Sequence, residues 1–103
     1  MYVSTVEKKC LIVKLTEKVE DLSFINTLFS ENCHHLILNL QEIELTNATL
    51  LSKFATFGKK LVGTNSFVIV STQFLNSEWN IVPTLKEAFD IIELEDIERQ
   101  LNL

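Results

Sequence analysis

The stretch from Leu36 to Gly63 limits the fold of this chain more than any other part of the sequence. It begins with an uninterrupted apolar run, Leu36 to Leu38, which predicts a strand covered on both faces, as in a parallel sheet. A polar connection follows, and a helix is predicted to begin at Thr46 or Asn47, because both residue types cap helix N-termini. A strand that leads directly into a helix is the place where α/β proteins put their working surfaces.

The helix predicted in this stretch has one wide apolar face. Apolar residues and one glycine recur every three or four positions along two adjacent stripes: Leu50, Phe54, Phe57 and Leu61, and Leu51, Ala55, Gly58 and Val62. Gly63 stands where a helix-ending glycine is expected. We therefore expect this helix to pack against the sheet with its polar face towards solvent.

The segments before this stretch predict a hairpin and a helix. Tyr2–Val6 and Cys10–Leu15 have the β-branched and apolar content of strands, and the polar link between them is so short that the strands must be antiparallel neighbours. The first strand is expected at a sheet edge. A helix is predicted over Thr16–Phe29, because apolar residues line one side of this segment and acidic residues occupy its first turns.

The segments after it predict two more strands and two more helices. Phe67–Ser71 is a continuous apolar run typical of an interior strand, and a short helix is predicted from Thr72 to about Pro83, carrying Phe74, Leu75, Trp79 and Val82. Phe89–Ile92 is predicted as a short strand. Glu93–Leu101 is predicted as an amphipathic helix whose Leu94, Ile97 and Leu101 point inward.

The alternation of strands and helices defines the fold class. The predicted order is β-β-α-β-α-β-α-β-α, which gives a mostly parallel central sheet with one antiparallel N-terminal edge strand and helices on the sheet faces. A chain of 103 residues, 47% of them hydrophobic, is enough for one domain with a real core, so residues 1–103 are expected to form a single domain. No apolar run reaches the ~18 residues of a membrane span, and no signal-peptide pattern is present, which predicts a cytoplasmic protein without membrane insertion.

Composition excludes several function classes. The net charge of −5 argues against nucleic-acid binding and favours a protein partner with a positively charged patch. Only two glycines are present, so a glycine-rich phosphate loop is excluded, and no cofactor is expected. Cys33, His34 and His35 lack further ligands at a suitable spacing, so the two histidines are interpreted as loop residues at a strand entrance, without a metal.

Acidic residues occur at two places that invite a functional interpretation. Glu42 and Glu44 lie in the connection before the central helix, where, with no nucleophile nearby, they are interpreted as solvated loop carboxylates. The C-terminal segment carries Glu93, Glu95, Asp96 and Glu98. These are interpreted as a solvated helix face, with docking of a basic partner as the alternative.

The order of elements and the central stretch resemble the STAS domain family, which includes bacterial anti-sigma-factor antagonists. In that family a strand ending in Asp-Leu is followed by Asp-Ser-Ser-Gly-Leu at the start of a helix. Here Leu38-Asn39-Leu40 and Asn47-Ala48-Thr49-Leu50-Leu51 stand at those places. The segments 79–85 and Phe89–Ile92 follow the spacing of two later family segments, Leu-x-x-x-x-Gly-Leu and Phe-x-Ile. The resemblance covers residues 36–101.

The resemblance implies a switch that this sequence lacks. In the antagonists the serine after the motif aspartate is phosphorylated by an anti-sigma-factor kinase, and the added charge turns partner binding off. This sequence has Ala48 at that position and Asn47 in place of the aspartate. Thr49 matches the second serine and is a candidate phosphorylation site, although a hydroxyl beside an N-cap is usually only a helix-start residue.

The function implied by the resemblance is a regulatory protein–protein interaction without catalysis. The expected partner surface is the start of the central helix: Thr46, Asn47, Ala48, Thr49, Ser52 and Lys53. The expected partner is an anti-sigma factor or a serine-kinase-type regulator, and the alternative is the ATPase of a membrane transporter, since STAS domains are also transporter subunits. A small ligand-binding or enzymatic α/β domain, and a homodimer formed through Tyr2–Val6, stay open as further alternatives.

Overall fold

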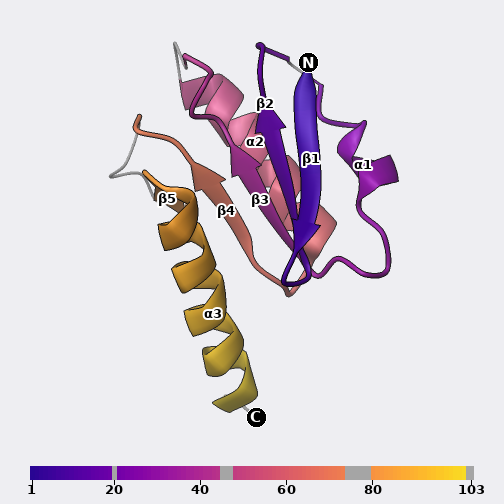
Figure 1. The fold of residues 1–103 in the computed structure, drawn as a ribbon, viewed down its shortest axis with the longest axis vertical. Helices are drawn as coiled ribbons and strands as arrows, with labels where there is room; N and C mark the ends of the chain where they lie inside the picture. Colours follow the sequence, from indigo (N-terminus) through magenta and orange to yellow (C-terminus); the bar gives the residue numbers. More distant parts are fainter. Residues whose placement is uncertain (20, 45–47, 74–79, 102–103) are drawn as a thin grey trace.

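The computed structural model describes residues 1–19, 21–44, 48–73 and 80–101, which form a five-stranded mixed sheet and three helices (Figure 1). The strands are β1 (Tyr2–Glu7), β2 (Cys10–Leu15), β3 (His35–Asn39), β4 (Phe67–Val70) and β5 (Ile81–Val82). The helices are α1 (Ile25–Leu28), α2 (Ala48–Val62) and α3 (Leu85–Leu101). The strands lie in the order β1-β2-β3-β4-β5, with β1 antiparallel to β2 and each later pair parallel. The predicted α/β class, the mixed sheet and the antiparallel edge strand are confirmed.

The N-terminal hairpin turns through two lysines. Lys8 and Lys9 have φ angles of 53° and 64°, and they join Glu7 to Cys10, which are paired across the two strands. Two consecutive residues with positive φ are typical of the hairpin turn whose twist matches that of the flanking strands. The turn directs β2 into the sheet interior and leaves β1 at the edge.

The inner strands are buried on both faces, as their uninterrupted apolar runs predict. Leu36 and Leu38 of β3 belong to the core that α1 and α2 cover, whereas Ile37 between them belongs to the core beneath α3. All residues of β3 and β4 are buried. Successive side chains of a strand point to opposite faces of the sheet, so they pack into two separate cores, one on each face.

The central helix matches its prediction closely. α2 begins at Ala48, buries Leu51 and Phe54 against the sheet, and is followed by Gly63 at φ +61°. Gly58 is buried where α2 crosses β4, and a Cβ atom at this position would overlap the ring of Phe67. The glycine thus permits the close approach of the helix to the sheet.

The helix predicted over Thr16–Phe29 is wrong for most of its length. Among the described residues of this segment only α1 is helical, and Leu22 and Ile25 anchor it in the core. The carboxylate of Asp21 accepts hydrogen bonds from the backbone N–H and the hydroxyl of Ser23, at 2.9 and 3.0 Å. Such local bonds offer the backbone an alternative to a helix, so the acidic residues did not form a first helical turn here.

The C-terminal third also differs from its prediction. Phe89–Ile92 is not a strand, because it lies within the long helix α3, and the last strand is β5. Val82, predicted as helical, pairs with β4, and its carbonyl accepts a hydrogen bond from the N–H of Ser71 at 2.9 Å. The predicted helix residues Phe74, Leu75 and Trp79 lie outside the described residues.

The orientation of the last helix is the third correction. Leu94, Ile97 and Leu101 were expected to point inward, but 59%, 46% and 78% of their surfaces are exposed. Ala88 and Ile92 are the buried residues of α3, because the helix begins eight residues earlier than predicted and its contact face is set by its first half.

No helix in the described ranges is both long enough and apolar enough to cross a membrane.

Candidate functional site

The chain directly after β3, up to Gln41, is held by the side chains of two polar residues. The carboxamide oxygen of Asn39 accepts a hydrogen bond from the backbone N–H of Gln41 at 2.9 Å. The side chain of Gln41 in turn donates to the carbonyl of Pro83 at 3.0 Å. The first residues after β3 are therefore tied to the residue that follows β5.

A shallow cleft of about 360 Å³ lies where β3 and β4 end, and residues 40–44 and 71–73 line it. Glu42 and Glu44 are exposed, as expected for solvated loop carboxylates, and Glu42 forms a 2.5 Å ion pair with the half-exposed Lys14. Ligand crevices in open α/β sheets form where the strand order reverses. The five described strands follow one another in sequence order without reversal, so this cleft is not such a crevice.

The start of α2 carries the described part of the predicted partner surface. Thr49, Ser52 and Lys53 are all exposed, and their spacing of three and four residues places them on one side of the helix. Ala48 is the first residue of α2. Thr46 and Asn47 lie outside the described residues.

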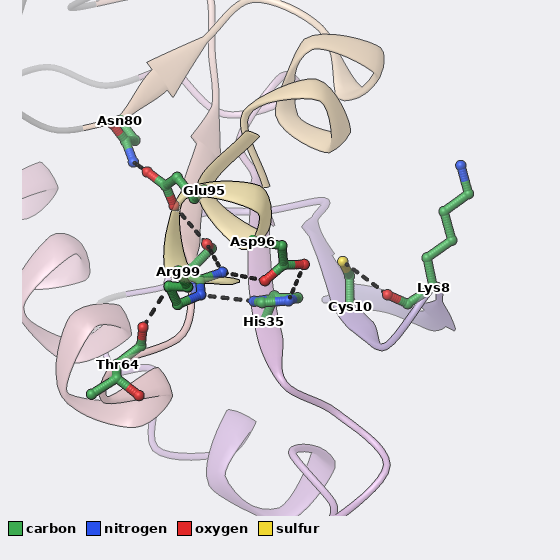
Figure 2. A network of polar contacts seen from close by, with 9 residues as sticks. Lys8, Cys10, His35, Thr64, Asn80, Glu95, Asp96 and Arg99 are labelled. Carbon is green, nitrogen blue, oxygen red and sulfur yellow. Dashed lines mark hydrogen bonds and ion pairs between the residues drawn. The ribbon is translucent and has the colours of Figure 1, made fainter. Parts of the chain in front are cut away.

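A buried polar cluster lies at the other end of the strands, where β3 and β4 begin (Figure 2), and it was not predicted from the sequence. His35, the first residue of β3, is only 3% exposed. Its Nδ1 accepts a hydrogen bond from the backbone N–H of Ser66 at 3.0 Å, and its Nε2 lies 3.2 Å from a carboxylate oxygen of Asp96 on α3. These partners define a neutral imidazole with its proton on Nε2.

Arg99 and Glu95 extend the cluster along α3. The Arg99 guanidinium pairs with Asp96, donates to the Ser66 hydroxyl at 2.9 Å and reaches the Thr64 carbonyl at 3.3 Å. The Ser66 hydroxyl donates to Glu95 at 2.5 Å, and Glu95 also accepts a bond from the side chain of Asn80 at 3.0 Å. The cluster therefore joins the amino ends of β3, β4 and β5 to the second half of α3.

Burial and neighbouring charges set the protonation states of this cluster. Burial lowers the pKa of His35 and outweighs the opposing effect of the Asp96 carboxylate. Burial alone would raise the pKa of Asp96, but the bond from Arg99 and the contacts with His35 lower it on balance. Because His35 is neutral near pH 7, Arg99 is the cation that keeps Asp96 ionised.

Cys10 lies close to this cluster but has little nucleophilic character. Burial, together with the negative charge of Asp96, raises the pKa of the Cys10 thiol to about 11. The thiol donates to the carbonyl of Lys8 at 3.6 Å, and it is buried as a small core side chain. It therefore stays protonated at neutral pH, and thiolate chemistry is not supported here.

The cluster serves to hold elements together, because its groups already have partners. Both ring nitrogens of His35 are engaged, so neither is open to take a proton from a substrate. Among the described residues, no buried side-chain nitrogen or oxygen lacks a hydrogen-bond partner, and no group of three acidic, His or Cys residues is arranged to hold a metal. His34 is exposed, as expected for a loop residue, whereas that interpretation is wrong for His35.

The interpretation of Glu95 and Asp96 as solvated residues is also corrected. Both are only partly exposed and bond to groups on the sheet. One signal for this existed in the sequence, because Glu95, Asp96 and Arg99 share one side of a helix by their spacing. Their partners His35 and Ser66 are distant in the sequence, so the pairing itself was not visible.

Models of known protein families and curated proteins were compared with this sequence, and none of them matches it. The resemblance to STAS domains, which covers residues 36–101, is therefore supported by neither comparison and stays a prediction. Its C-terminal part is weakened by the structure, because Phe89–Ile92 is helical and not a strand.

Proposed function

We propose that this protein is a non-enzymatic regulatory interaction module, similar to an anti-sigma-factor antagonist, that binds its partner through the start of α2. The observation that supports this proposal is the two-sided construction of the helix. Thr49, Ser52 and Lys53 are exposed on one side, while the other side is anchored by the buried residues Leu51, Phe54 and Ala55. A helix held in this way presents its outer side chains on an ordered backbone, so binding a partner needs no further ordering of the backbone.

The surroundings of α2 also favour an interface over a substrate site. The nearby cleft of about 360 Å³ is open and lined mainly by polar loop residues. Gln41 and Ser71, which line it, and Asn39, which precedes its first lining residue, already use their side chains in hydrogen bonds. A surface of exposed polar side chains with one lysine suits recognition of a complementary protein surface.

The proposed mechanism has no phosphate switch at Ala48, because alanine has no hydroxyl group to modify. Binding is therefore constitutive or regulated at another place. Phosphorylation at the exposed Thr49 stays a prediction, and intact-mass measurement of protein from native cells would detect it. The proposed partner is an anti-sigma factor or serine-kinase-type regulator, with the ATPase of a membrane transporter as the alternative.

Affinity capture with matched variants tests this surface. The tagged protein, the double variant Ala48→Asp with Lys53→Glu, and the control Lys59→Glu would be used to capture partners from native cells for mass spectrometry. Lys53 and Lys59 are both exposed on α2, at its start and in its last turn, so both variants reverse one lysine charge on the same helix. We expect the double variant to lose the partner and the control to keep it.

The identity of the recovered protein separates the alternatives. A kinase-type regulator or a sigma-pathway protein would support the antagonist-like function, and transporter subunits would replace it with the transporter alternative. Equal recovery by the double variant and the wild type would remove the start of α2 as the binding surface. Circular dichroism of each variant verifies that the fold is retained.

A further inference from the structure

α3 has two apolar faces, of which the sheet covers only one. Ala88 and Ile92 are buried against the sheet. Leu94, Ile97 and Leu101 follow one another at spacings of three and four residues on the side of the helix that points away from it. With 59%, 46% and 78% of their surfaces exposed, they form a continuous apolar stripe along the second half of α3.

Acidic residues border this stripe on both sides. Glu93 lies on one flank of the stripe and Glu98 on the other, while Asp90 and Glu87 lie one and two turns before Leu94, and all four are exposed. Of the two basic residues of α3, Lys86 lies one turn before Asp90 and two turns before Leu94, and Arg99 is bound to Asp96 on the inner side, so neither adjoins the stripe itself. The stripe is therefore an apolar surface with a negatively charged rim.

A groove adjoins the stripe and shares Ile97 with it. The groove has a volume of about 380 Å³ and runs between α3 and the β1–β2 turn. Phe89, Ile92 and Ile97 supply its apolar wall, while Lys8 and Cys10 lie on the hairpin side, with the Lys8 ammonium 5.3 Å from the centre of the Phe89 ring. This groove has room for one apolar side chain from a molecule that lies along α3.

We propose that the outer face of α3 is a second interaction surface, which binds a basic amphipathic helix of another protein. Apolar side chains of that helix, one turn apart, would cover Leu94, Ile97 and Leu101, and one of them would enter the groove beside Phe89. Its lysine or arginine side chains would lie opposite Asp90, Glu93 and Glu98. An exposed apolar patch rimmed by charge is typical of a protein–protein contact.

The acidic rim distinguishes this partner from a second copy of the chain. If two copies packed their stripes together, Asp90, Glu93 and Glu98 of one would face the same residues of the other. Such like-charge contacts oppose association, whereas a basic helix neutralises them. The surface is also separate from the start of α2, because α2 and α3 cover opposite faces of the sheet.

Two synthetic peptides of about 18 residues, or five helical turns, test the proposal on the full chain. Both carry leucines along one face, and the opposite face is lysine in the first and glutamate in the second. Fluorescence anisotropy of the labelled peptides would measure their binding. We expect the lysine peptide to bind at least about tenfold more tightly than the glutamate peptide, and to weaken as salt is raised, because salt screens the contacts with the rim.

Two matched double variants locate the binding. Leu94→Ser with Ile97→Ser removes two exposed apolar side chains from the stripe, and Val3→Ser with Val6→Ser removes two from β1. We expect the first pair to weaken binding of the lysine peptide by about tenfold or more and the second to leave it unchanged. Both variants replace exposed residues, and a urea unfolding curve verifies that each one folds.

Three results would overturn the proposal. The first is equal binding of the lysine and glutamate peptides, and the second is equal binding of the lysine peptide to the two variants. The third is a dimer of the wild type in light scattering that Leu94→Ser with Ile97→Ser converts to a monomer, since the stripe would then belong to a second copy. None of these results bears on capture through α2, so the two surfaces are tested independently.

Discussion

At the scale of single residues, His35 shows what burial demands of an imidazole. Two ring nitrogens lose water when the side chain enters the core, and each must find a partner, because an unpaired buried polar group costs about 1–3 kcal/mol. The backbone N–H of Ser66 and the carboxylate of Asp96 provide those partners. The same contacts fix the tautomer, so the residue is suited to hold β3, β4 and α3 together.

Replacing His35 with phenylalanine should destabilise the protein by about 2–4 kcal/mol, because the N–H of Ser66 and the carboxylate of Asp96 both lose a partner. The ring of phenylalanine is similar in shape, so the loss reports mainly on the hydrogen bonds. Urea unfolding at pH 7 measures the change in the free energy of unfolding.

His34→Phe is the matched control, because His34 is the neighbouring histidine and is exposed. A substitution at such a position usually changes stability by no more than about 0.5 kcal/mol. If the free energy of unfolding fell by the same amount in both variants, the hydrogen bonds of His35 would not stabilise the fold.

At the scale of elements, α3 begins directly after a residue that caps helix N-termini. The hydroxyl of Thr84 accepts a hydrogen bond from the backbone N–H of Glu87 at 3.2 Å. The pair has the spacing of a capping box, a threonine followed three residues later by a glutamate. Pro83 directly before Thr84 separates this helix from β5.

Thr84→Ala should lower the free energy of unfolding by about 1 kcal/mol, because the N–H of Glu87 loses its capping acceptor. Thr84→Asp should restore most of this loss, since aspartate is also a good N-cap and its charge suits the helix dipole. Urea unfolding measures all three proteins, and Thr64→Ala, at an exposed position before β4, serves as the control. A restored cap that regained no stability would contradict the role given to Thr84.

The elements that the sequence predicted well are those with one possible periodicity. β2, β3 and β4 each contain a run of three or four apolar residues bounded by polar residues, and α2 has apolar residues at helical spacing that ends at Gly63. Phe89–Ile92 is different, because its apolar residues fit both a short strand and one turn of a helix. The capping box at Thr84 and Glu87 decides for the helix, and that signal was available in the sequence.

The candidate sites were predictable to different degrees for a physical reason. The proposed partner surface at Thr49, Ser52 and Lys53 depends only on local helical spacing, and the three residues are exposed on one side of α2. The cluster around His35 depends on tertiary contacts, since Ser66 lies 31 residues further along the chain. Periodicity carries no information about such pairs.

At the scale of the whole molecule, the two faces of the sheet are covered in different ways. α1 and α2 cover one face with many buried apolar side chains. α3 alone covers the described part of the other, and its fully buried residues are only Ala88 and Ile92. The polar cluster at His35 therefore supplies much of the specificity with which α3 lies on the sheet, and the attachment of this helix should respond to pH.

Lowering the pH from 7.5 to 5.5 should destabilise the wild type through His35. Its pKa in the folded state lies below 6.5, the ordinary value, because burial disfavours the charged ring. Around and below pH 6.5 the unfolded chain takes up a proton that the folded protein does not, so the free energy of unfolding falls as the pH falls towards the folded pKa. One such proton is worth up to about 1.4 kcal/mol per pH unit.

The groups that face His35 define how this prediction is measured. Asp96 and Arg99 approach from α3, His34 adjoins it in the chain, and Cys10 lies on the neighbouring strand. Asp96 has a lowered pKa, so its stabilising effect is complete above its unfolded value of 3.8 and is lost only as the pH falls further, through its folded pKa. The window between pH 7.5 and 5.5 therefore isolates the histidine. Urea unfolding at both pH values should show a smaller loss for His35→Phe than for the wild type, and equal losses would mean that His35 titrates alike in the folded and unfolded chain.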